Sequence, residues 1–483
     1  MKKSILSIFV LLTCASALTC RAENIGVPPE CEDVMLQVFY WDSYKTQSGT
    51  DSKYGRTKWI DLLKDTAAIN ANFDLVWFPP SASGGGVGYT HKQLSDQNGD
   101  WGTSTKLKEL IAALHAGNTK VLADIVINHR GNKSNWCDFK EDNFGSYGSF
   151  QLTQQHICKG DEGFTDKSSS CYGASASERG AADTGSNFDG ARDLDHTSEY
   201  VQNWAKAYVQ WMINVMKYDG FRYDMTLGYH GRYLSMYNEA SNPYLSVSEL
   251  WEGITRQKQH LEETNYNTMI FDFQQKYELH KAIVGGSYSK LMKNSNSFRG
   301  QGLEKYAVTF IDNHDTFERD GYGNNQFGGQ YCDLDKETVK ANVLQAYAYI
   351  LSMPGVPCVF WPHWYKYKDE INKFIKIRKL AGIHSESAVS DESYSQYNYS
   401  GTIQGKKHKV ILRLGKNRDM SAPAGYGMCA NGDHYSVYVE GVQGLEEVTD
   451  GLQGKGEKFL DEGKLYIRVG EDVYDPMGRK INK

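Results

Sequence analysis

Gly220-Phe221-Arg222-Tyr223-Asp224 and, further along the chain, Val247-Ser248-Glu249-Leu250-Trp251 decide the fold of this chain. Each is an apolar run that ends beside a carboxylate. Phe310-Ile311-Asp312-Asn313-His314-Asp315 has the same form, and Asp124-Ile125-Val126-Ile127-Asn128-His129 ends in an amide and an imidazole. Polar groups at the ends of several separate strands are typical of barrel enzymes, which build their sites at the C-terminal rim of the strands.

Apolar, strand-like runs alternate with helical patterns along most of the sequence. Eight runs have strand character: 34–41, 73–80, 120–128, 220–225, 244–251, 268–273, 306–312 and 356–361. Between them, apolar residues recur every three or four positions, as over 58–70 and 104–116. Near-continuous apolar strands are buried on both faces of a parallel sheet. Eight such units therefore predict an α/β fold, a closed (β/α)8 TIM barrel.

Two regions break this alternation. Residues 131–192 lack amphipathic helices and are rich in Gly, Ser, Asp, Asn and aromatic residues, which predicts a loop-rich insertion after the third strand. From residue 385 to 483, short strand-like pieces between Gly-rich turns predict a C-terminal antiparallel β domain. The barrel itself is expected over 23–130 and 193–384.

The N-terminus predicts an exported protein. Met1-Lys2-Lys3, an apolar run and then Ala15-Ser16-Ala17 are typical of a signal peptide, expected over 1–22. We expect the mature protein to be extracellular or periplasmic; a lipid anchor on Cys20 is an alternative that its sequence context disfavours. No second run is long enough to span a membrane.

Charge and cysteine content narrow the class of protein. The net charge is −6 and basic residues are scattered, which argues against nucleic acid as a partner and fits a neutral substrate.

Cys137, Cys158 and Cys171 lie close enough in sequence for one disulfide among them, but spacing does not fix the pair. The cysteines do not form a CxxC motif, so a zinc site is not expected. A monomer is expected.

The carboxylates predict acid–base and nucleophilic chemistry. Residues two apart on a strand share a face, so Arg222 and Asp224 both point toward the barrel mouth, and the guanidinium keeps Asp224 ionised. Glu249 lies beside Leu250 and Trp251 and near other carboxylates, which raises the pKa of an acid. Glu249 is therefore the better proton donor.

The four motifs resemble the four signature regions of the α-amylase family of glycoside hydrolases, in the family's order. Pro354-Gly355-Val356-Pro357-Cys358-Val359-Phe360 and Gly382-Ile383-His384-Ser385-Glu386-Ser387 are similar to plant-type members in particular. The resemblance covers about residues 34 to 390. It implies Asp224 as the nucleophile, Glu249 as the general acid/base and Asp315 as the carboxylate that orients substrate and stabilises the transition state.

The same resemblance implies further site residues and a cofactor. Tyr89, His129, Arg222 and His314 would contact the substrate or position the nucleophile. Calcium is the implied metal, because amide, carboxylate and carbonyl oxygens are its usual ligands. The implied ligands are Asn128, Asp183 and Asp193, with the backbone carbonyls of Ser186 and Gly228.

One residue departs from the family pattern. Three positions after the nucleophile the family usually has Lys or Arg, and this chain has Leu227. Binding on the leaving-group side is expected to differ accordingly.

The sequence thus predicts an exported, retaining endo-α-1,4-glucan hydrolase acting on starch, glycogen or maltodextrins. A transglycosylase or a maltogenic exo-acting relative is one alternative. A non-catalytic starch-binding protein is another, against which the intact Asp224, Glu249 and Asp315 argue.

Overall fold

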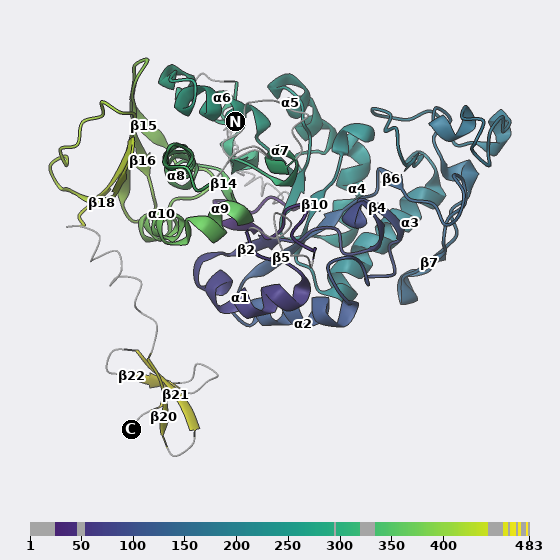
Figure 1. Ribbon diagram of the computed structural model, residues 1–483, viewed down its shortest axis with the longest axis horizontal. Helices are drawn as coiled ribbons and strands as arrows, with labels where there is room; N and C mark the ends of the chain where they lie inside the picture. The colour runs from purple at the N-terminus through teal and green to yellow at the C-terminus, as the bar shows by residue number, and fades with distance from the viewer. Residues whose placement is uncertain are drawn as a thin grey trace, which may run out of the picture.

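The computed structural model describes residues 25–45, 54–293, 296–318 and 334–442, together with the backbone of four short strands between 457 and 481. The predicted signal peptide and Cys20 lie outside these residues. Figure 1 shows a barrel in the middle, a β-sheet at one end and a loop-rich region at the other. Within the described residues, none of the helices is both long and apolar enough to cross a bilayer.

Eight parallel strands close into a barrel in the order β1-β14-β13-β12-β11-β10-β5-β2, which confirms the predicted fold. They are β1 (Met35–Gln37), β2 (Leu75–Trp77), β5 (Lys120–Ile125), β10 (Gly220–Tyr223), β11 (Ser246–Ser248), β12 (Met269–Phe271), β13 (Ala307–Phe310) and β14 (Val356–Phe360). Each strand is shorter than its predicted run. The polar residue that ends a run lies just past the strand, as Asp224 does after β10.

Helices surround the barrel (Figure 1). The longer ones are α1 (Trp59–Asn72), α2 (Ser104–His115), α3 (Glu199–Trp211), α4 (Gly231–Ser241), α5 (Ile254–Glu263), α6 (Phe273–Ile283), α8 (Glu337–Ser352) and α10 (Lys368–Ala381). In α2 the side chain of Thr103 caps the first turn by accepting from Lys106 N. Its buried residues Leu107, Leu110, Ile111 and Leu114 have the spacing that places one apolar stripe against the strands.

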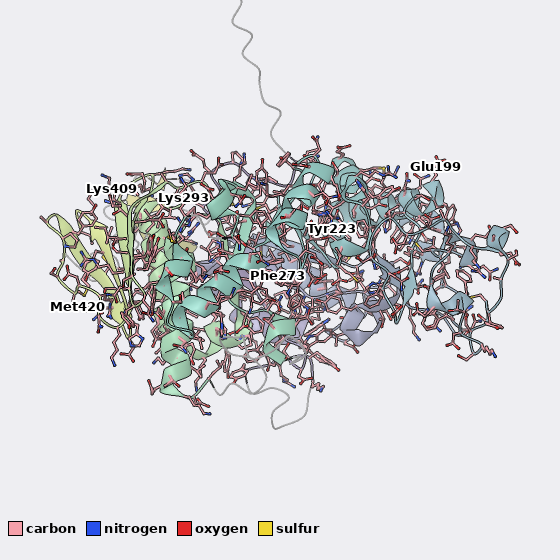
Figure 2. All side chains as sticks on the ribbon, turned by 90° about the horizontal axis from the view of Figure 1, so that it is seen from above. Glu199, Tyr223, Phe273, Lys293, Lys409 and Met420 are labelled. Atoms are coloured by element: carbon pink, nitrogen blue, oxygen red, sulfur yellow. A yellow bond between two sulfur atoms is a disulfide. The ribbon has the colours of Figure 1, made fainter. Side chains whose placement is uncertain are left out.

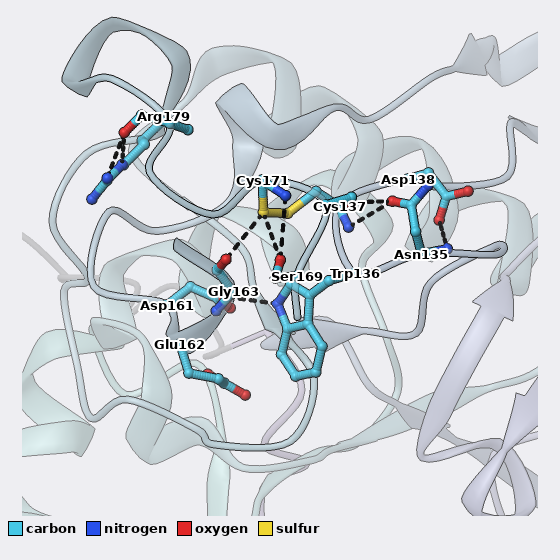
Figure 3. The surroundings of a disulfide bond; sticks show 12 residues. Asn135, Trp136, Cys137, Asp138, Asp161, Glu162, Gly163, Ser169, Cys171 and Arg179 are labelled. Atoms are coloured by element: carbon cyan, nitrogen blue, oxygen red, sulfur yellow. Dashed lines mark hydrogen bonds between the residues drawn. A yellow bond between two sulfur atoms is a disulfide. The ribbon is translucent and has the colours of Figure 1, made fainter. Parts of the chain in front are cut away.

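The insertion is joined to the barrel at its base. Strand β6 (His129–Arg130) pairs antiparallel with β9 (Arg192–Asp193), so His129 lies opposite Asp193. Cys137 and Cys171 form a disulfide within the insertion and leave Cys158 as a buried free thiol. Figure 3 shows Trp136 next to this disulfide, where its Nε1 donates to Asp161 Oδ1 over 2.8 Å.

A five-stranded antiparallel sheet follows the barrel. Its order is β15 (Val389–Tyr394), β16 (Tyr399–Gln404), β17 (Lys409–Leu414), β19 (Tyr435–Glu440) and β18 (Tyr426–Gly432). Val410, Leu412 and Leu414 alternate with more exposed residues, so one face is buried against the barrel helices. Figure 2 shows Met420 and Lys409 in this end of the molecule and Glu199 of α3 toward the other.

Four more antiparallel strands form a separate sheet: β20 (Glu457–Asp461), β21 (Lys464–Val469), β22 (Asp472–Tyr474) and β23 (Lys480–Ile481). The C-terminal part of the chain therefore contains antiparallel β-structure, as predicted. The exact limits predicted for the domains stay predictions.

Candidate active site

A cavity of about 880 Å³ opens at the C-terminal ends of the barrel strands. It is lined by Trp41, Gly86, Tyr89, Thr90, His129, Phe188, Asp224, Met225, Leu227, Glu249, Trp251, His314 and Asp315. The structure thus brings six of the seven predicted catalytic and substrate-binding residues to one cavity. The seventh, Arg222, is buried behind the carboxylates with 1% of its surface exposed.

Arg222 joins three carboxylates. Its Nη1 donates to Asp124 Oδ1 and to Asp224 Oδ1, each over 2.7 Å, and its Nη2 lies 2.8 Å from Glu249 Oε1. The sequence predicted only the contact with Asp224. Because one guanidinium holds both Asp224 and Glu249 through its two terminal nitrogens, it fixes the positions of these carboxyls relative to each other.

Glu249 is placed to hold a proton. Burial raises its pKa to about 8, and although Arg222 lowers it, the charges of Asp224 and Asp315 raise it further. Its Oε2 accepts from Met225 N over 3.0 Å. Met225 has φ 45° and ψ 51°, a left-handed conformation that is costly for a residue with a side chain. This strained residue turns its amide toward Glu249, which sequence patterns did not indicate.

Asp124 belongs to one of the four motifs but was not predicted as a site residue. Its Oδ2 accepts from Trp77 Nε1 over 3.1 Å and from Tyr89 OH over 3.0 Å. Burial raises the pKa of Asp124, whereas Arg222 lowers it. Asp124 is the second-to-last residue of β5, and its carboxylate meets Arg222, so its place near the end of an apolar strand was the available signal.

Tyr89 and His314 form one hydrogen-bonded pair. Tyr89 OH lies 2.9 Å from His314 Nε2, and Gln37 Nε2 lies 3.1 Å from His314 Nδ1. Since Gln37 donates to Nδ1, the imidazole carries its proton on Nε2, directed at the Tyr89 oxygen. The rings of Tyr89 and His314 are 8° from parallel, with centroids 5.5 Å apart. Tyr89 follows a short turn, Gly86–Gly88, that connects β3 (Ser83–Gly85) and β4 (Thr90–Gln93).

Asp315 projects from the first turn of the short helix α7 (His314–Glu318), which follows β13. Trp41 Nε1 donates to Asp315 Oδ1 over 3.1 Å. Trp41 lies beyond the end of β1, far away in sequence, and was not predicted as a site residue. The contact fixes one oxygen of Asp315 at the cavity wall.

His129 lies on the insertion side of the cavity. Its Nε2 donates to the Tyr89 carbonyl over 2.9 Å, and its ring stacks on Phe188 with centroids 4.1 Å apart. Burial lowers its pKa, so the ring is neutral at pH 7. These contacts connect the turn that carries Tyr89 with Phe188 of the insertion.

The predicted calcium ligands also converge. Asn128 Nδ2 lies 3.3 Å from Asp193 Oδ1, and a Cβ added at Gly228 would lie 2.0 Å from Asn128 Oδ1, so only glycine fits there. Ser186 N donates to Leu227 O over 3.0 Å, which brings Ser186 next to Gly228. Burial raises the pKa of Asp193 to about 8, and the charge of Asp183 raises it further.

Asp183 supplies an oxygen suited to a cation. Its Oδ2 is buried and has no hydrogen-bond partner. No group of three or more His, Cys, Asp or Glu in the described residues is arranged to hold a metal, and the predicted set contains only two carboxylates. The remaining oxygens come from an amide and from backbone carbonyls, which are hard ligands of the kind that Ca²⁺ takes.

Leu227 lies in the cavity wall and packs against an apolar cluster made of Leu250, Leu261, Ile270, Phe298 and Ala307. A side chain without charge or donor therefore stands where the resemblance implies a cation. Its backbone carbonyl accepts from Ser186, so the loop keeps its contact with the insertion.

Comparison with known proteins shows what this site and fold are similar to. The model of the alpha-amylase catalytic domain matches residues 60–363. "Probable alpha-amylase 2" of Arabidopsis thaliana is 29% identical over 430 residues, which cover 84% of this chain and 94% of that protein. "Glucan 1,4-alpha-maltotetraohydrolase" of Stutzerimonas stutzeri is 27% identical over 488 residues, or 94% of this chain and 80% of that protein.

Two further comparisons differ in length or in sequence. "Alpha-amylase 3, chloroplastic" of Arabidopsis thaliana is 28% identical over 435 residues, and the match spans 85% of this chain but 43% of that protein. The solved structure of the cyclomaltodextrin glucanotransferase CldA superposes with a TM-score of 0.61 at 15% identity, covering 85% of this chain and 99% of that one. The latter likeness shows the fold alone.

Proposed function

Because the chain belongs to the alpha-amylase family of glycoside hydrolases, we propose that it is an exported, retaining, endo-acting α-1,4-glucan hydrolase. Its proposed substrates are starch, glycogen and maltodextrins, and it acts as a monomer. One observation carries the proposal: Asp224, Glu249 and Asp315 line a single cavity, and Arg222 binds the first two.

The geometry suits a double displacement. Asp224 attacks the anomeric carbon while Glu249 protonates the leaving oxygen, and Glu249 then activates the water that hydrolyses the glycosyl-enzyme. Retaining enzymes hold these two carboxyls about 5 to 5.5 Å apart, and here the two terminal nitrogens of Arg222 each bind one of them. Asp315 contributes a fixed negative charge that stabilises the oxocarbenium-like transition state more than the neutral substrate.

The stereochemistry of the product tests this function. Two displacements at one carbon restore its configuration, so reducing ends released from maltoheptaose are expected to appear first as the α-anomer. Proton NMR during the first minutes, before mutarotation, measures this. Initial β-anomer would exclude the nucleophilic role of Asp224, and no release of reducing ends would exclude hydrolysis.

The pH profile tests the role of Glu249. Glu249 must hold a proton to act as an acid, and its pKa is raised to about 8. We therefore expect kcat/KM to fall as pH rises through about 8, above the range in which an ordinary Glu loses its proton. Measurement between pH 5 and 10, with melting temperatures across the same range as a stability control, decides the point. An alkaline limb near pH 5 would contradict the assignment.

An alternative function is supported by one residue of the cavity and by two of the similar proteins. Leu227 replaces the cation expected on the leaving-group side, and the relatives include one named for maltotetraose release and a fold neighbour named for glucan transfer. An exo-acting or transferring relative is therefore the alternative. A time course of product lengths on amylose separates the three, since endo-action gives mixed lengths early, exo-action gives one short product and transfer gives longer or cyclic chains.

Calcium is the proposed metal. The unpartnered Oδ2 of Asp183, the raised pKa of Asp193 and the close approach of Gly228 to Asn128 all fit a cation held by Asn128, Asp183, Asp193 and the carbonyls of Ser186 and Gly228. When bound, the ion would supply positive charge that links the insertion to the loop after β10. None of these residues is a proposed catalytic group.

Removal of the metal is expected to lower stability more than chemistry. An ion at about 100 times its Kd stabilises the fold by about 2.7 kcal/mol, so EDTA should lower the melting temperature of a chain of this length by about 3 °C or more. Asp183→Asn should lower the melting temperature even without EDTA, and EDTA should then lower it little further. Asp189→Asn, an exposed carboxylate in the same loop, is the control. An EDTA-insensitive melting temperature in a calcium-free protein would contradict the site.

A further inference from the structure

A buried charged cluster lies behind the turn that carries His314 and Asp315. It consists of Lys276 on α6, Asp312 between β13 and α7, and His363 on α9 (Trp361–Lys366). Lys276 Nζ lies 3.8 Å from Asp312 Oδ1, and His363 Nε2 lies 3.7 Å from Asp312 Oδ2. All three side chains are completely buried. None of them lines the cavity, so the proposed mechanism does not use them.

Asp312 is connected to the turn that presents Asp315. Thr316 Oγ1 donates to Asp312 Oδ1 over 2.9 Å and accepts from Asn313 N over 3.0 Å. Asn313 Oδ1 in turn accepts from Asp315 N and Thr316 N, over 3.0 and 2.9 Å. The carboxylate of Asp312 thereby fixes the Thr316 hydroxyl, and these four residues close the turn from which Asp315 enters the cavity.

On the other side of Asp312, the ring of His363 is held by a hydrogen bond to Tyr347. Phe360 N donates to Tyr347 OH over 3.1 Å, and Tyr347 OH lies 3.1 Å from His363 Nδ1. In the tautomer in which Tyr347 OH donates to Nδ1, His363 carries its proton on Nε2, the nitrogen that faces Asp312 Oδ2. Burial lowers the pKa of His363 to about 3, so this ring is neutral. The positive charge in the cluster is that of Lys276.

Such a pair is hard to explain by stability. Removing a lysine and an aspartate from water costs several kcal/mol per ion, and apolar residues of similar volume often stabilise a fold as well or better. The charged pair does, however, hold one acceptor in one orientation. We propose that Lys276 is a positioning residue, which fixes the turn bearing Asp315 through Asp312 and Thr316. The inference rests on the proposed role of Asp315 in the transition state.

Lys276→Met is the main test, because methionine fills a similar volume without charge. A displaced Asp315 impairs transition-state stabilisation more than substrate binding, so we expect kcat on maltoheptaose to fall about tenfold and KM to change less than about twofold. Arg378→Met is the matched control. Arg378 is an equally buried cation, but it donates to Met353 O and Gly355 O at the start of β14, at the opposite end of the barrel. The Arg378→Met variant should have a lower melting temperature but an unchanged kcat, when kcat is measured well below that temperature.

A double-mutant cycle tests whether Lys276 acts on Asp315 through Asp312. If Lys276 acts through Asp312, then Lys276→Met in an Asp312→Asn background should lower kcat by less than about twofold. Full additivity of the two losses would overturn the proposal. Thr316→Val keeps the side-chain volume and removes the hydroxyl link, so it gives the same kcat-selective loss even if Lys276→Met does not fold.

Crystal structures of Lys276→Met and Thr316→Val decide the geometry without any substrate. Asp315 Oδ1 should leave Trp41 Nε1, from which it is 3.1 Å away in the wild type. An unmoved Asp315, or an unchanged kcat in variants that fold, would overturn the inference. If the wild-type protein releases no reducing ends, the proposed function fails instead, and the position of Asp315 in the two variants still tests Lys276.

Discussion

Asp224→Asn and Glu249→Gln are each expected to abolish starch hydrolysis while the protein stays folded. Both changes keep side-chain volume and keep an oxygen that accepts from Arg222. Each removes a step of the chemistry, since Asn is a poor nucleophile and Gln cannot donate a proton as an acid does. The loss should be on the order of a hundredfold or more in kcat. Reducing-sugar assays with circular dichroism and melting curves measure rate and fold together.

Glu252→Gln is the matched control for this pair. Glu252 follows Glu249 by three positions in the chain and is not part of the cavity wall. It should retain activity close to that of the wild type. More than about a tenth of the wild-type rate in either Asp224→Asn or Glu249→Gln would refute the catalytic assignment.

Arg222→Leu is expected to have the largest effect on stability. Arg222 is 1% exposed and binds Asp124, Asp224 and Glu249, so its removal leaves three carboxyls close together without their cation. Breaking a buried ion pair by removing one partner costs about 3 to 5 kcal/mol. We expect a loss of this size in the free energy of unfolding at pH 8, together with the loss of activity.

The pH dependence of that loss distinguishes charge from packing. Protonation neutralises the carboxyls that Arg222 otherwise balances, so the destabilisation should shrink as pH falls from 8 to 5. Urea denaturation of the wild type and the variant at both pH values measures it. Arg256→Leu is the control, because Arg256 is more exposed and, among the described residues, forms an ion pair with Glu263 only. A loss below about 1 kcal/mol, or one independent of pH, would mean that Arg222 does not hold the three groups as described.

The sequence predicted the barrel because its signals are local. A buried parallel strand is a short apolar run, and an amphipathic helix repeats every three or four residues, so the eight strands were found from neighbouring residues alone. It also predicted that Asp224, Glu249 and Asp315 meet, because parallel strands that close into a barrel bring their C-terminal ends to one rim. The structure places all three in one cavity. Their catalytic roles stay predictions.

Contacts between distant segments were not predictable in this way. No spacing rule pairs Cys137 with Cys171 rather than with Cys158, and none shows that Trp41 reaches Asp315. The bonding of Arg222 to three carboxylates depends on rotamers that the packed barrel selects.

The sequence by itself therefore determined the barrel and its insertion and placed the candidate catalytic carboxylates at one rim, since backbone periodicity and burial act over a few residues. Tertiary structure alone decided how the side chains are held: Arg222 among its acids, Asp124 beneath Tyr89, and Lys276 behind Asp312. The physical reason is that a buried polar group must find partners wherever the closed fold brings them. Closure of the barrel decides which of these polar side chains come into contact, whereas their separation in the sequence does not.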